Sequence, residues 1–326
     1  MFDTVAGKWR RGPYVPKDQS RNLWETRTHT FFDYNMKNRI TTVAHTLCRS
    51  EVRIAILGDG GLMRVEASLP KLLYGNNVKA VSAPLQAMKI LREFVMDHVA
   101  GNVPFIDEMD CLRVDFCHNF YVGVALPDYV DTLRHISFLQ SRFTYNEYGG
   151  VEWRGTNGRT VRIYDKYREI LEKEERDLPE ARGILRFEVQ IRRKSKYLQY
   201  RLGTKHLKMM DALDPVLAYR CLAETLDKMA LQSRFVRRDA AKTLLDATYG
   251  YRRSTQLLGV LRRLETEEIE DVKRASSRST FYADKAALRD LGLWPPSSGS
   301  TDLPGLQLPP FEELCSDRVV TTAAGL

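Results

Sequence analysis

Four short segments of the chain repeat one arrangement, in which an arginine stands two residues before a carboxylate or a tyrosine. The four pairs are Arg64 and Glu66, Arg113 and Asp115, Arg162 and Tyr164, and Arg186 and Glu188. Apolar residues alternate with these polar ones, which is the pattern of a strand with one buried face. If the four strands share one sheet, its polar face gathers three carboxylates, one tyrosine and several arginines. Such a face suits metal-assisted chemistry on phosphate.

The residue types suggest how these side chains could cleave a phosphodiester. Tyr164 is the candidate nucleophile, because a tyrosine can hold a covalent phosphoryl group for later transfer. A free phenol has a pKa of about 10, so we expect Lys166, on the same face two residues along, to stabilise the phenolate. The carboxylate oxygens of Glu66, Asp115 and Glu188 suit Mg²⁺ or Mn²⁺. The expected DNA-binding cations are Arg64, Arg113, Arg162, Arg186, Arg192, Arg193 and Lys194.

Each of these residues also has an ordinary structural interpretation. Tyr164 could pack on a neighbour as many strand tyrosines do, and the three carboxylates could pair with arginines across the sheet. His118 is kept as a reserve metal ligand, although a single histidine at a strand end is more often structural. The recurrence of one spacing in four segments favours a site over four separate coincidences.

The charge of the chain points to a polyanionic partner. The 326 residues carry a net charge of +8, and the sequence pI is about 9.2. These values favour nucleic acid or an anionic membrane surface as a partner. Much of the excess falls in a basic run between residues 182 and 208, which is either a solvated face or a DNA or RNA contact. Tyr197 and Tyr200 lie within this run and favour the nucleic-acid interpretation.

Cysteine usage and hydropathy predict a cytoplasmic protein. Five scattered cysteines without a C-x-x-C pair are typical of reduced thiols rather than of disulfides or a zinc site. The first residues lack the apolar segment of a signal peptide, and no run of about 18 apolar residues could span a membrane. We therefore expect no membrane partner.

Periodicity predicts an α+β fold for residues 1–210. Segments with strand patterns alternate with amphipathic helices at 84–99, 128–140 and 167–178. A hairpin is expected over 142–165, because Asn157-Gly158 is a strong turn signal. The expected architecture is an antiparallel-rich sheet with helices on one face and an open catalytic face.

The rest of the chain has a different character. Residues 211–294 read as amphipathic helices only, and the segment from Ser276 to Lys285 resembles the turn and second helix of a helix-turn-helix DNA reader. An ordinary helical bundle explains the same pattern and is the simpler interpretation. Residues 295–326 are rich in Pro, Ser, Gly and Thr and are expected to form a disordered tail.

Four stretches in order carry a resemblance to a known family. They are MRVEASLPKLLYGNN, LRVDFCHNF, VRIYDKYRE and LRFEVQIRRK. Together they resemble the gene II/X replication initiators of filamentous phages and the related trans-acting Rep initiators of rolling-circle plasmids. The likeness covers roughly residues 40–210, and SRSTFYADKAALRDLGL looks like a C-terminal segment of the phage family. It implies that Tyr164 is the nicking residue with Lys166 beside it, and that Glu66, Asp115 and Glu188 are the acidic strand residues.

One departure separates the chain from the wider group of rolling-circle endonucleases. None of its six histidines forms a His-hydrophobic-His pair, so metal binding would rest on carboxylates. Tyr167 is a substitute nucleophile if Tyr164 is not the one used.

The leading hypothesis is a metal-dependent DNA nickase and strand transferase that initiates rolling-circle replication, with a host helicase and polymerase as partners. It would nick one origin strand through a 5′-phosphotyrosine and later rejoin it. The alternative is a regulator that binds an origin or promoter without cutting. An RNA-binding protein is less favoured, because no aromatic stacking motif of that type is present.

Overall fold

The structure analysed is a computed structural model of the chain. It describes all residues except 11, 18–23, 34–37, 50, 58–59, 104–107, 135, 137–141, 147, 156–157, 194, 205, 233–234, 237, 268, 295–301, 316–320 and 323–326. Within the described strands and helices, some further side chains are too uncertain to place, chiefly in residues 27–43.

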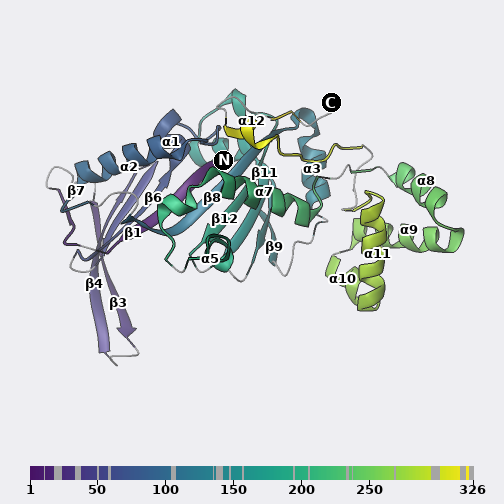
Figure 1. The fold of residues 1–326 in the computed structure, drawn as a ribbon, viewed down its shortest axis with the longest axis horizontal. Coiled ribbons are helices and arrows are strands. Elements are labelled where there is room, and N and C mark those ends of the chain that lie inside the picture. Colours follow the sequence, from purple (N-terminus) through teal and green to yellow (C-terminus); the bar gives the residue numbers. More distant parts are fainter. Residues whose placement is uncertain are drawn as a thin grey trace.

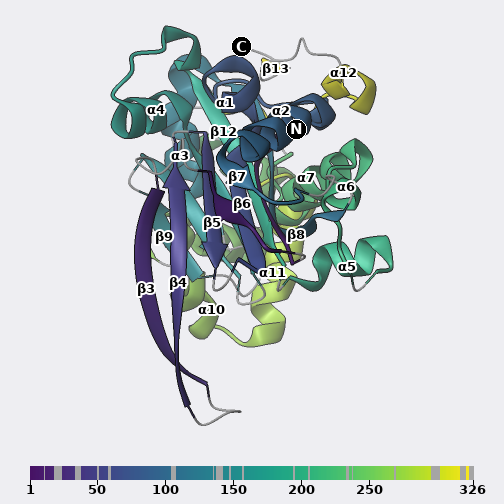
Figure 2. The same cartoon turned by 90° about the vertical axis from the view of Figure 1, so that its left-hand side faces the viewer.

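An eleven-stranded sheet forms the body of the protein (Figure 1). Ten strands pair antiparallel in the order β3-β4-β5-β6-β1-β8-β12-β11-β10-β9, and β13 (Thr321–Thr322) pairs parallel with β8. The ten strands are β1 (Phe2–Trp9), β3 (Trp24–Asp33), β4 (Asn38–Cys48), β5 (Val52–Leu57), β6 (Leu62–Ser68), β8 (Asp110–Tyr121), β9 (Arg142–Asn146), β10 (Gly150–Arg154), β11 (Arg159–Asp165) and β12 (Ile184–Arg192). Two short strands, β2 (Val15–Pro16) and β7 (Val99–Ala100), form a separate pair. The long strands β3 and β4 extend beyond the others at one end (Figure 2).

The alternating sequence gives this sheet two unlike faces. In β11, Val161 and Ile163 are fully buried in the hydrophobic core, whereas Arg162 lies on the opposite face. The predicted hairpin is confirmed, since β10 and β11 pair antiparallel on either side of the Asn157-Gly158 turn signal. Residues 156–157 lie outside the described residues, and Gly158 has a φ of 82°, a conformation that glycine adopts without strain.

Helices pack on the apolar face of the sheet. These are α2 (Pro84–His98), α3 (Leu126–Leu133) and α7 (Pro215–Met229), and their buried side chains join the same hydrophobic cluster as the strands. The first and second match predicted helices, although α3 ends earlier than predicted. The opposite face carries the arginines, the carboxylates and Tyr164. The predicted α+β class is therefore confirmed: an antiparallel sheet followed by a largely helical C-terminal region.

Two helices flank one end of the polar face. The first, α1 (Leu69–Tyr74), follows β6, and the second, α4 (Lys166–Glu174), follows β11 without a loop. Asp165 caps α4, because its carboxylate accepts a hydrogen bond from the Arg168 backbone N–H at 3.2 Å. An ion pair of 2.8 Å between Lys71 and Glu174 links the two helices.

The sheet domain continues past residue 210. Helices α5 (Lys196–Leu202), α6 (Met209–Ala212) and α7 follow β12, and Leu217, Leu222 and Leu226 of α7 are buried in the core of the sheet. A second hydrophobic core belongs to the four helices α8 (Arg238–Thr248), α9 (Tyr251–Thr266), α10 (Ile269–Arg274) and α11 (Arg278–Asp290). The two cores therefore divide near residue 230 and not at the predicted boundary of 210.

The predicted disordered tail contains an ordered segment. Leu303, Leu306 and Leu314 are buried in the core of the sheet, and Leu303 exchanges backbone hydrogen bonds with Phe235 at 2.8 and 3.0 Å. Helix α12 (Phe311–Cys315) belongs to the same segment. The prediction of disorder was wrong for residues 302–315, because the leucines between the prolines supply enough apolar surface to pack. Among the described helices, none is long and apolar enough to cross a membrane.

Candidate active site

The register of three neighbouring strands places an acidic, a basic and an acidic residue side by side. Glu152 of β10 is opposite Arg162 of β11, and Arg162 is opposite Glu188 of β12. Arg162 donates from Nε to Glu152 Oε2 at 2.5 Å and from Nη1 to Glu188 Oε1 at 2.9 Å. Both carboxylates are almost fully buried, so the arginine supplies the counter-charge that burial requires.

Tyr164 lies two residues beyond Arg162 on the same face. Its hydroxyl donates a hydrogen bond of 3.1 Å to Glu188 Oε2, and only 4% of the residue is exposed. Burial, assisted by the negative charge of Glu188, raises the pKa of Tyr164 well above its ordinary value of 10. The phenol is therefore held protonated, with a carboxylate positioned to accept its proton.

Gly150 allows β10 to pass close to Tyr164. A Cβ atom at Gly150 would lie 2.3 Å from the Ile163 carbonyl oxygen and 2.5 Å from the Tyr164 Cβ. These distances are too short for any side chain, and the first contact is with backbone that cannot move aside. The lack of a side chain at Gly150 therefore allows the backbone of β10 to pack directly against Tyr164.

The predicted helper Lys166 is close to Tyr164 but not on a strand. It is the first residue of α4, so the prediction that both residues share a strand face was wrong. The ammonium is fully buried, lies 5.9 Å from the centroid of the Tyr164 ring and donates to Glu169 Oε2 at 2.5 Å. Burial, together with the charge of Arg186, lowers the pKa of Lys166 to about 8. Tyr167, the substitute nucleophile, does not line the pocket and accepts a hydrogen bond from Arg182 at 3.3 Å.

Arg113 joins two of the predicted metal ligands. It contacts Glu66 Oε1 at 2.6 Å and makes a two-pronged contact with Asp115, in which Nε to Oδ1 is 2.8 Å. Asp115 is 1% exposed, and burial raises its pKa to about 7 although the charge of Arg113 opposes this shift.

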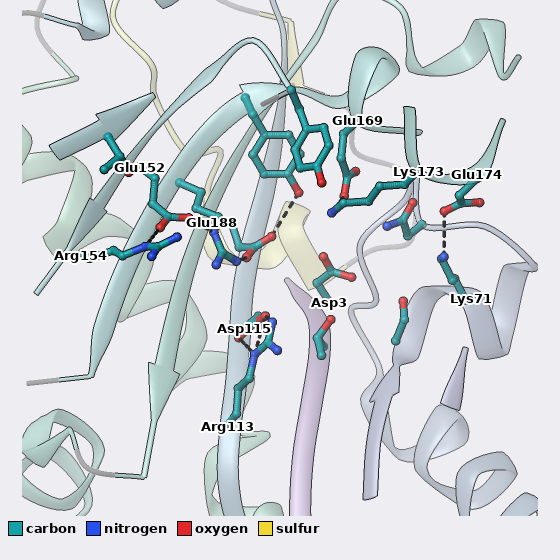
Figure 3. Close-up of a pocket in the computed structure, with 17 residues that line it drawn as sticks. Asp3, Lys71, Arg113, Asp115, Glu152, Arg154, Glu169, Lys173, Glu174 and Glu188 are labelled. Carbon is teal, nitrogen blue, oxygen red and sulfur yellow. Dashed lines mark hydrogen bonds and ion pairs between the residues drawn. The ribbon is translucent and has the colours of Figure 1, made fainter. Parts of the chain in front are cut away.

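One cavity of about 600 Å³ lies at the polar face of the sheet (Figure 3). Its lining does not include Glu66 or Lys166, but it does include Arg113, Asp115, Glu152, Arg162, Tyr164, Glu169 and Glu188. Its walls come from β1, β8, β10, β11 and β12 and from the two helices α1 and α4. Figure 3 shows Asp3 between Asp115 and Glu169, opposite Glu188. The cavity is lined by positively and negatively charged side chains, with arginines and lysines beside carboxylates. This lining suits a phosphate and the sugar that carries it.

The predicted ligands do not fit a divalent cation as they are arranged. Arg113 bridges Glu66 and Asp115, whereas Glu188 is engaged by Arg162 and Tyr164. Across the described residues, no group of three or more His, Cys, Asp or Glu side chains could hold a metal ion. The reserve ligand His118 is buried on the opposite, apolar face against Phe120, and burial lowers its pKa to about 3. Arginine side chains thus occupy the positions where Mg²⁺ or Mn²⁺ was expected.

The predicted DNA-binding residues differ in how far they are exposed. Arg64, Arg192 and Arg193 are exposed, while Arg113 and Arg162 are partly buried by their ion pairs. Lys194 lies outside the described residues. Arg186 was wrongly assigned to DNA.

The side chain of Arg186 has no exposed surface. It donates to Asn119 Oδ1 and to the Val78 carbonyl oxygen, both at 2.8 Å, and to Asp3 at 3.3 Å. Its role in this conformation is structural.

Glu152 and Asp3 are among the pocket residues that were not predicted from the sequence. Glu152 precedes Arg154 with the same two-residue spacing in reverse order, and a hairpin centred on Asn157 pairs it with Arg162. The expected register of the hairpin was therefore enough to identify Glu152 as the partner of Arg162. Asp3 has no such signal, because it reaches the pocket only through the pairing of β1 with β8. One of its carboxylate oxygens is buried without a hydrogen-bond partner among the described residues.

Comparison with other proteins adds no family assignment. No family model matches the chain, and no curated protein is similar to it at a significant level.

Proposed function

We propose that this chain is a site-specific DNA nickase that initiates rolling-circle replication through a covalent bond to Tyr164. One observation carries the proposal: a buried tyrosine hydroxyl donates to Glu188 in a pocket lined by arginines. A nucleophile, a proton acceptor and cations for phosphate are the parts that transfer of a phosphodiester to an enzyme hydroxyl requires. The resemblance of VRIYDKYRE and the three companion stretches to replication initiators supports the same assignment.

The proposed step uses only groups of the chain and the DNA. Tyr164 Oη attacks the phosphorus, Glu188 accepts the phenol proton, and the bond from phosphorus to the 3′-oxygen breaks. The leaving oxygen takes up a proton from solvent, and the phosphate remains on Tyr164 as a 5′-phosphotyrosine. Reversal of the step by a 3′-hydroxyl rejoins the strand. The free 3′-OH would serve a host polymerase, with a host helicase to unwind the duplex.

Arg113 and Arg162 are the cations best placed to offset the charge of the phosphate. Each already engages two carboxylates, so an arriving phosphate competes with Glu66, Asp115, Glu152 or Glu188 for the guanidinium groups. Guanidinium groups bind phosphate oxygens in pairs, and such bonds are stronger than those between neutral groups. Binding of DNA would thereby release a carboxylate, and a Glu188 released from Arg162 would keep its hydrogen bond with Tyr164.

The burial of Tyr164 also favours a second candidate, a regulator that binds an origin without cutting it. A tyrosine that is 4% exposed, with its pKa raised, is what a purely structural strand residue would present. Both candidates predict DNA binding that weakens with salt. Only the nickase requires the hydroxyl of Tyr164.

The test compares wild type with Tyr164→Phe on supercoiled plasmid that carries the origin of the chain's own replicon. The reaction contains Mg²⁺ or Mn²⁺, with a chelator in a parallel set, because the resemblance leads us to expect a divalent cation. Tyr148→Phe removes another hydroxyl from the same pocket, and Tyr167→Phe removes the substitute nucleophile. With the metal present, nicked circles from wild type, Tyr148→Phe and Tyr167→Phe, but not from Tyr164→Phe, support the proposal. Origin binding without nicking under every condition supports the regulator.

A further inference from the structure

The four helices α8–α11 form a unit with a core of its own. Leu245, Leu257, Phe281 and Leu288 are buried within it, and Trp294 closes it with its ring 6.4 Å from that of Phe281. Figure 1 shows these helices grouped to one side of the sheet. Arg289, at the end of α11, reaches Asp227 of α7 at 3.4 Å, so the last turn of α11 faces the sheet domain.

Helices α10 and α11 are joined by a three-residue turn, residues 275–277. Ser277 caps α11, because its Oγ accepts a hydrogen bond from the Thr280 backbone N–H at 3.1 Å. Val272 before the turn and Phe281 after it are both buried in the same core, which fixes the two helices against each other. A turn of three or four residues between two helices is one feature of the helix-turn-helix arrangement.

One face of α11 is anchored firmly to α9. Phe281 and Leu288 are buried on it, and between them Asp284 is 2% exposed. The Asp284 carboxylate accepts hydrogen bonds from Arg253 at 2.5 Å and from Gln256 at 3.1 Å. A buried carboxylate with two partners on a neighbouring helix sets which side of α11 faces outward.

The outward side of α11 is polar and has small residues at its centre. Arg278, Ser279, Tyr282, Ala283 and Ala286 are exposed and fall on one side of the helix by their spacing. The Arg278 guanidinium lies 5.9 Å from the centroid of the Tyr282 ring. Alanines let the backbone approach a partner closely, while arginine, serine and tyrosine supply hydrogen bonds. This combination is unlike the large apolar face that a protein partner would bury.

The charges around the turn complement a polyanion. Lys273 and Arg274 end α10, and Arg278 begins α11. The acidic residues of α10 are Glu270 and Asp271, and Asp271 pairs with Arg274 at 2.6 Å. A cationic turn beside a narrow polar helix matches the way recognition helices enter the major groove with their N-terminal residues on base edges.

We propose that α11 is the recognition helix of a duplex-DNA reader, with its outward side in the major groove. The inference rests on the proposed function in taking DNA as the partner, but it needs no catalysis by Tyr164. It assigns sequence recognition of the duplex to α11 and strand cleavage to the polar face of the sheet.

The experiment uses the full chain and a pool of duplexes with a randomised central segment. Rounds of binding and amplification with wild type should enrich one sequence, whose affinity is then measured for two variants. Ala286→Glu puts a carboxylate on the outward side, and Ala247→Glu makes the same change at an exposed position of α8. Glutamate suits exposed helical positions, so both variants should fold.

We expect Ala286→Glu to bind the enriched duplex about 10- to 100-fold more weakly, and Ala247→Glu to bind within about twofold of wild type. A second pair guards against a local folding defect: Arg278→Ala should lose roughly 10-fold and relax one base preference, whereas Lys242→Ala on α8 should not. Failure of wild type to enrich any sequence would overturn the proposal. Equal affinities of Ala286→Glu and Ala247→Glu would also overturn it.

The two proposals fail separately in this design. Tyr164→Phe should bind the enriched duplex like wild type, which tests α11 without catalysis. Nicking of a single-stranded oligonucleotide by Ala286→Glu should match that of wild type, which tests the sheet without α11. A chain that enriches a duplex sequence and never nicks would retain the α11 assignment and lose the nickase.

Discussion

Replacing Glu188 by glutamine tests whether this carboxylate accepts the proton of Tyr164. Glutamine keeps the size of the side chain and one oxygen that can accept a hydrogen bond, but it cannot take a proton at neutral pH. The 3.1 Å bond from Tyr164 Oη to Glu188 Oε2 makes this carboxylate the nearest base described for the hydroxyl. Positioned general bases contribute about 10²- to 10⁴-fold to rate. We expect single-turnover nicking by Glu188→Gln to slow by at least about 100-fold.

A second effect of the Glu188→Gln substitution partly restores the nicking rate. For this reason the expected slowing is set at the lower end of the 10²- to 10⁴-fold range. The charge of Glu188 is one reason why the pKa of Tyr164 is raised, so its removal makes the phenol more acidic. The remaining activity of Glu188→Gln should therefore increase with pH more steeply than that of wild type, because hydroxide then removes the proton.

Glu152→Gln is the matched control for this prediction. Glu152 is equally buried and binds the same guanidinium of Arg162, but no contact of Glu152 with Tyr164 is described. Glu152→Gln should therefore lose less than about 10-fold in the same assay. A nicking rate of Glu188→Gln within about threefold of that of Glu152→Gln would refute the assignment of Glu188 as the base.

Three further predictions concern stability. Although burial opposes it, Lys166 lowers the pKa of Glu169 from 4.5 to about 2, so this carboxylate stabilises the fold above pH 4.5 and loses that effect as pH falls toward 2. In urea titrations the free energy of unfolding of Glu169→Gln should be roughly 2–3 kcal/mol below that of wild type at neutral pH. This difference should vanish near pH 2, and a difference that stays constant with pH would contradict the prediction. Gly150→Ala should lower the free energy of unfolding by about 1–3 kcal/mol, since its Cβ would lie 2.3 Å from the Ile163 carbonyl oxygen, and an unchanged value would count against the close approach. Arg186→Met should lower the free energy of unfolding by about 3–5 kcal/mol, because it leaves buried partners of the arginine unpaired. If the variant folds, the salt dependence of its DNA binding should match that of wild type. A shallower dependence would show that Arg186 contacts DNA.

The sheet was predictable because alternation and turn signals are local. Val161 and Ile163 alternate with Arg162 and Tyr164, and this pattern gave both the strand and its polar face. The pairing of Glu152 with Arg162 also follows from the hairpin turn, although it was not among the predictions.

Features that depend on distant pairing were not predictable in this way. Asp3 reaches the cavity through pairing of β1 with β8, more than a hundred residues away in the chain. The burial of Arg186 depends on Asn119 and the Val78 carbonyl, which no spacing rule connects. Similarly, the leucines at 303 and 306 pack although the composition around them suggested disorder. Composition describes whether a segment can bury apolar surface, but it does not say where a complementary surface lies.

The expectation of a carboxylate metal site shows the limit of a list of residue types. Glu66, Asp115 and Glu188 do share the polar face, as predicted, but Arg113 and Arg162 take up their charges. Asp115 binds Arg113, which lies two residues earlier on the same strand. For Glu188 and Glu66 the arginine comes from another strand, Arg162 of the adjacent β11 and Arg113 of β8 beyond β1. The pairing of these two depends on strand order, which the sequence patterns did not specify.

The most direct test of the account is to identify the residue that becomes linked to DNA. Wild-type protein is incubated with origin DNA, the nicked product is digested with protease, and the peptide left on the 5′ end is sequenced by mass spectrometry. The account predicts one peptide whose phosphorylated residue is Tyr164. A DNA end that carries no peptide, or a peptide linked through Tyr167 or any other residue, would contradict it.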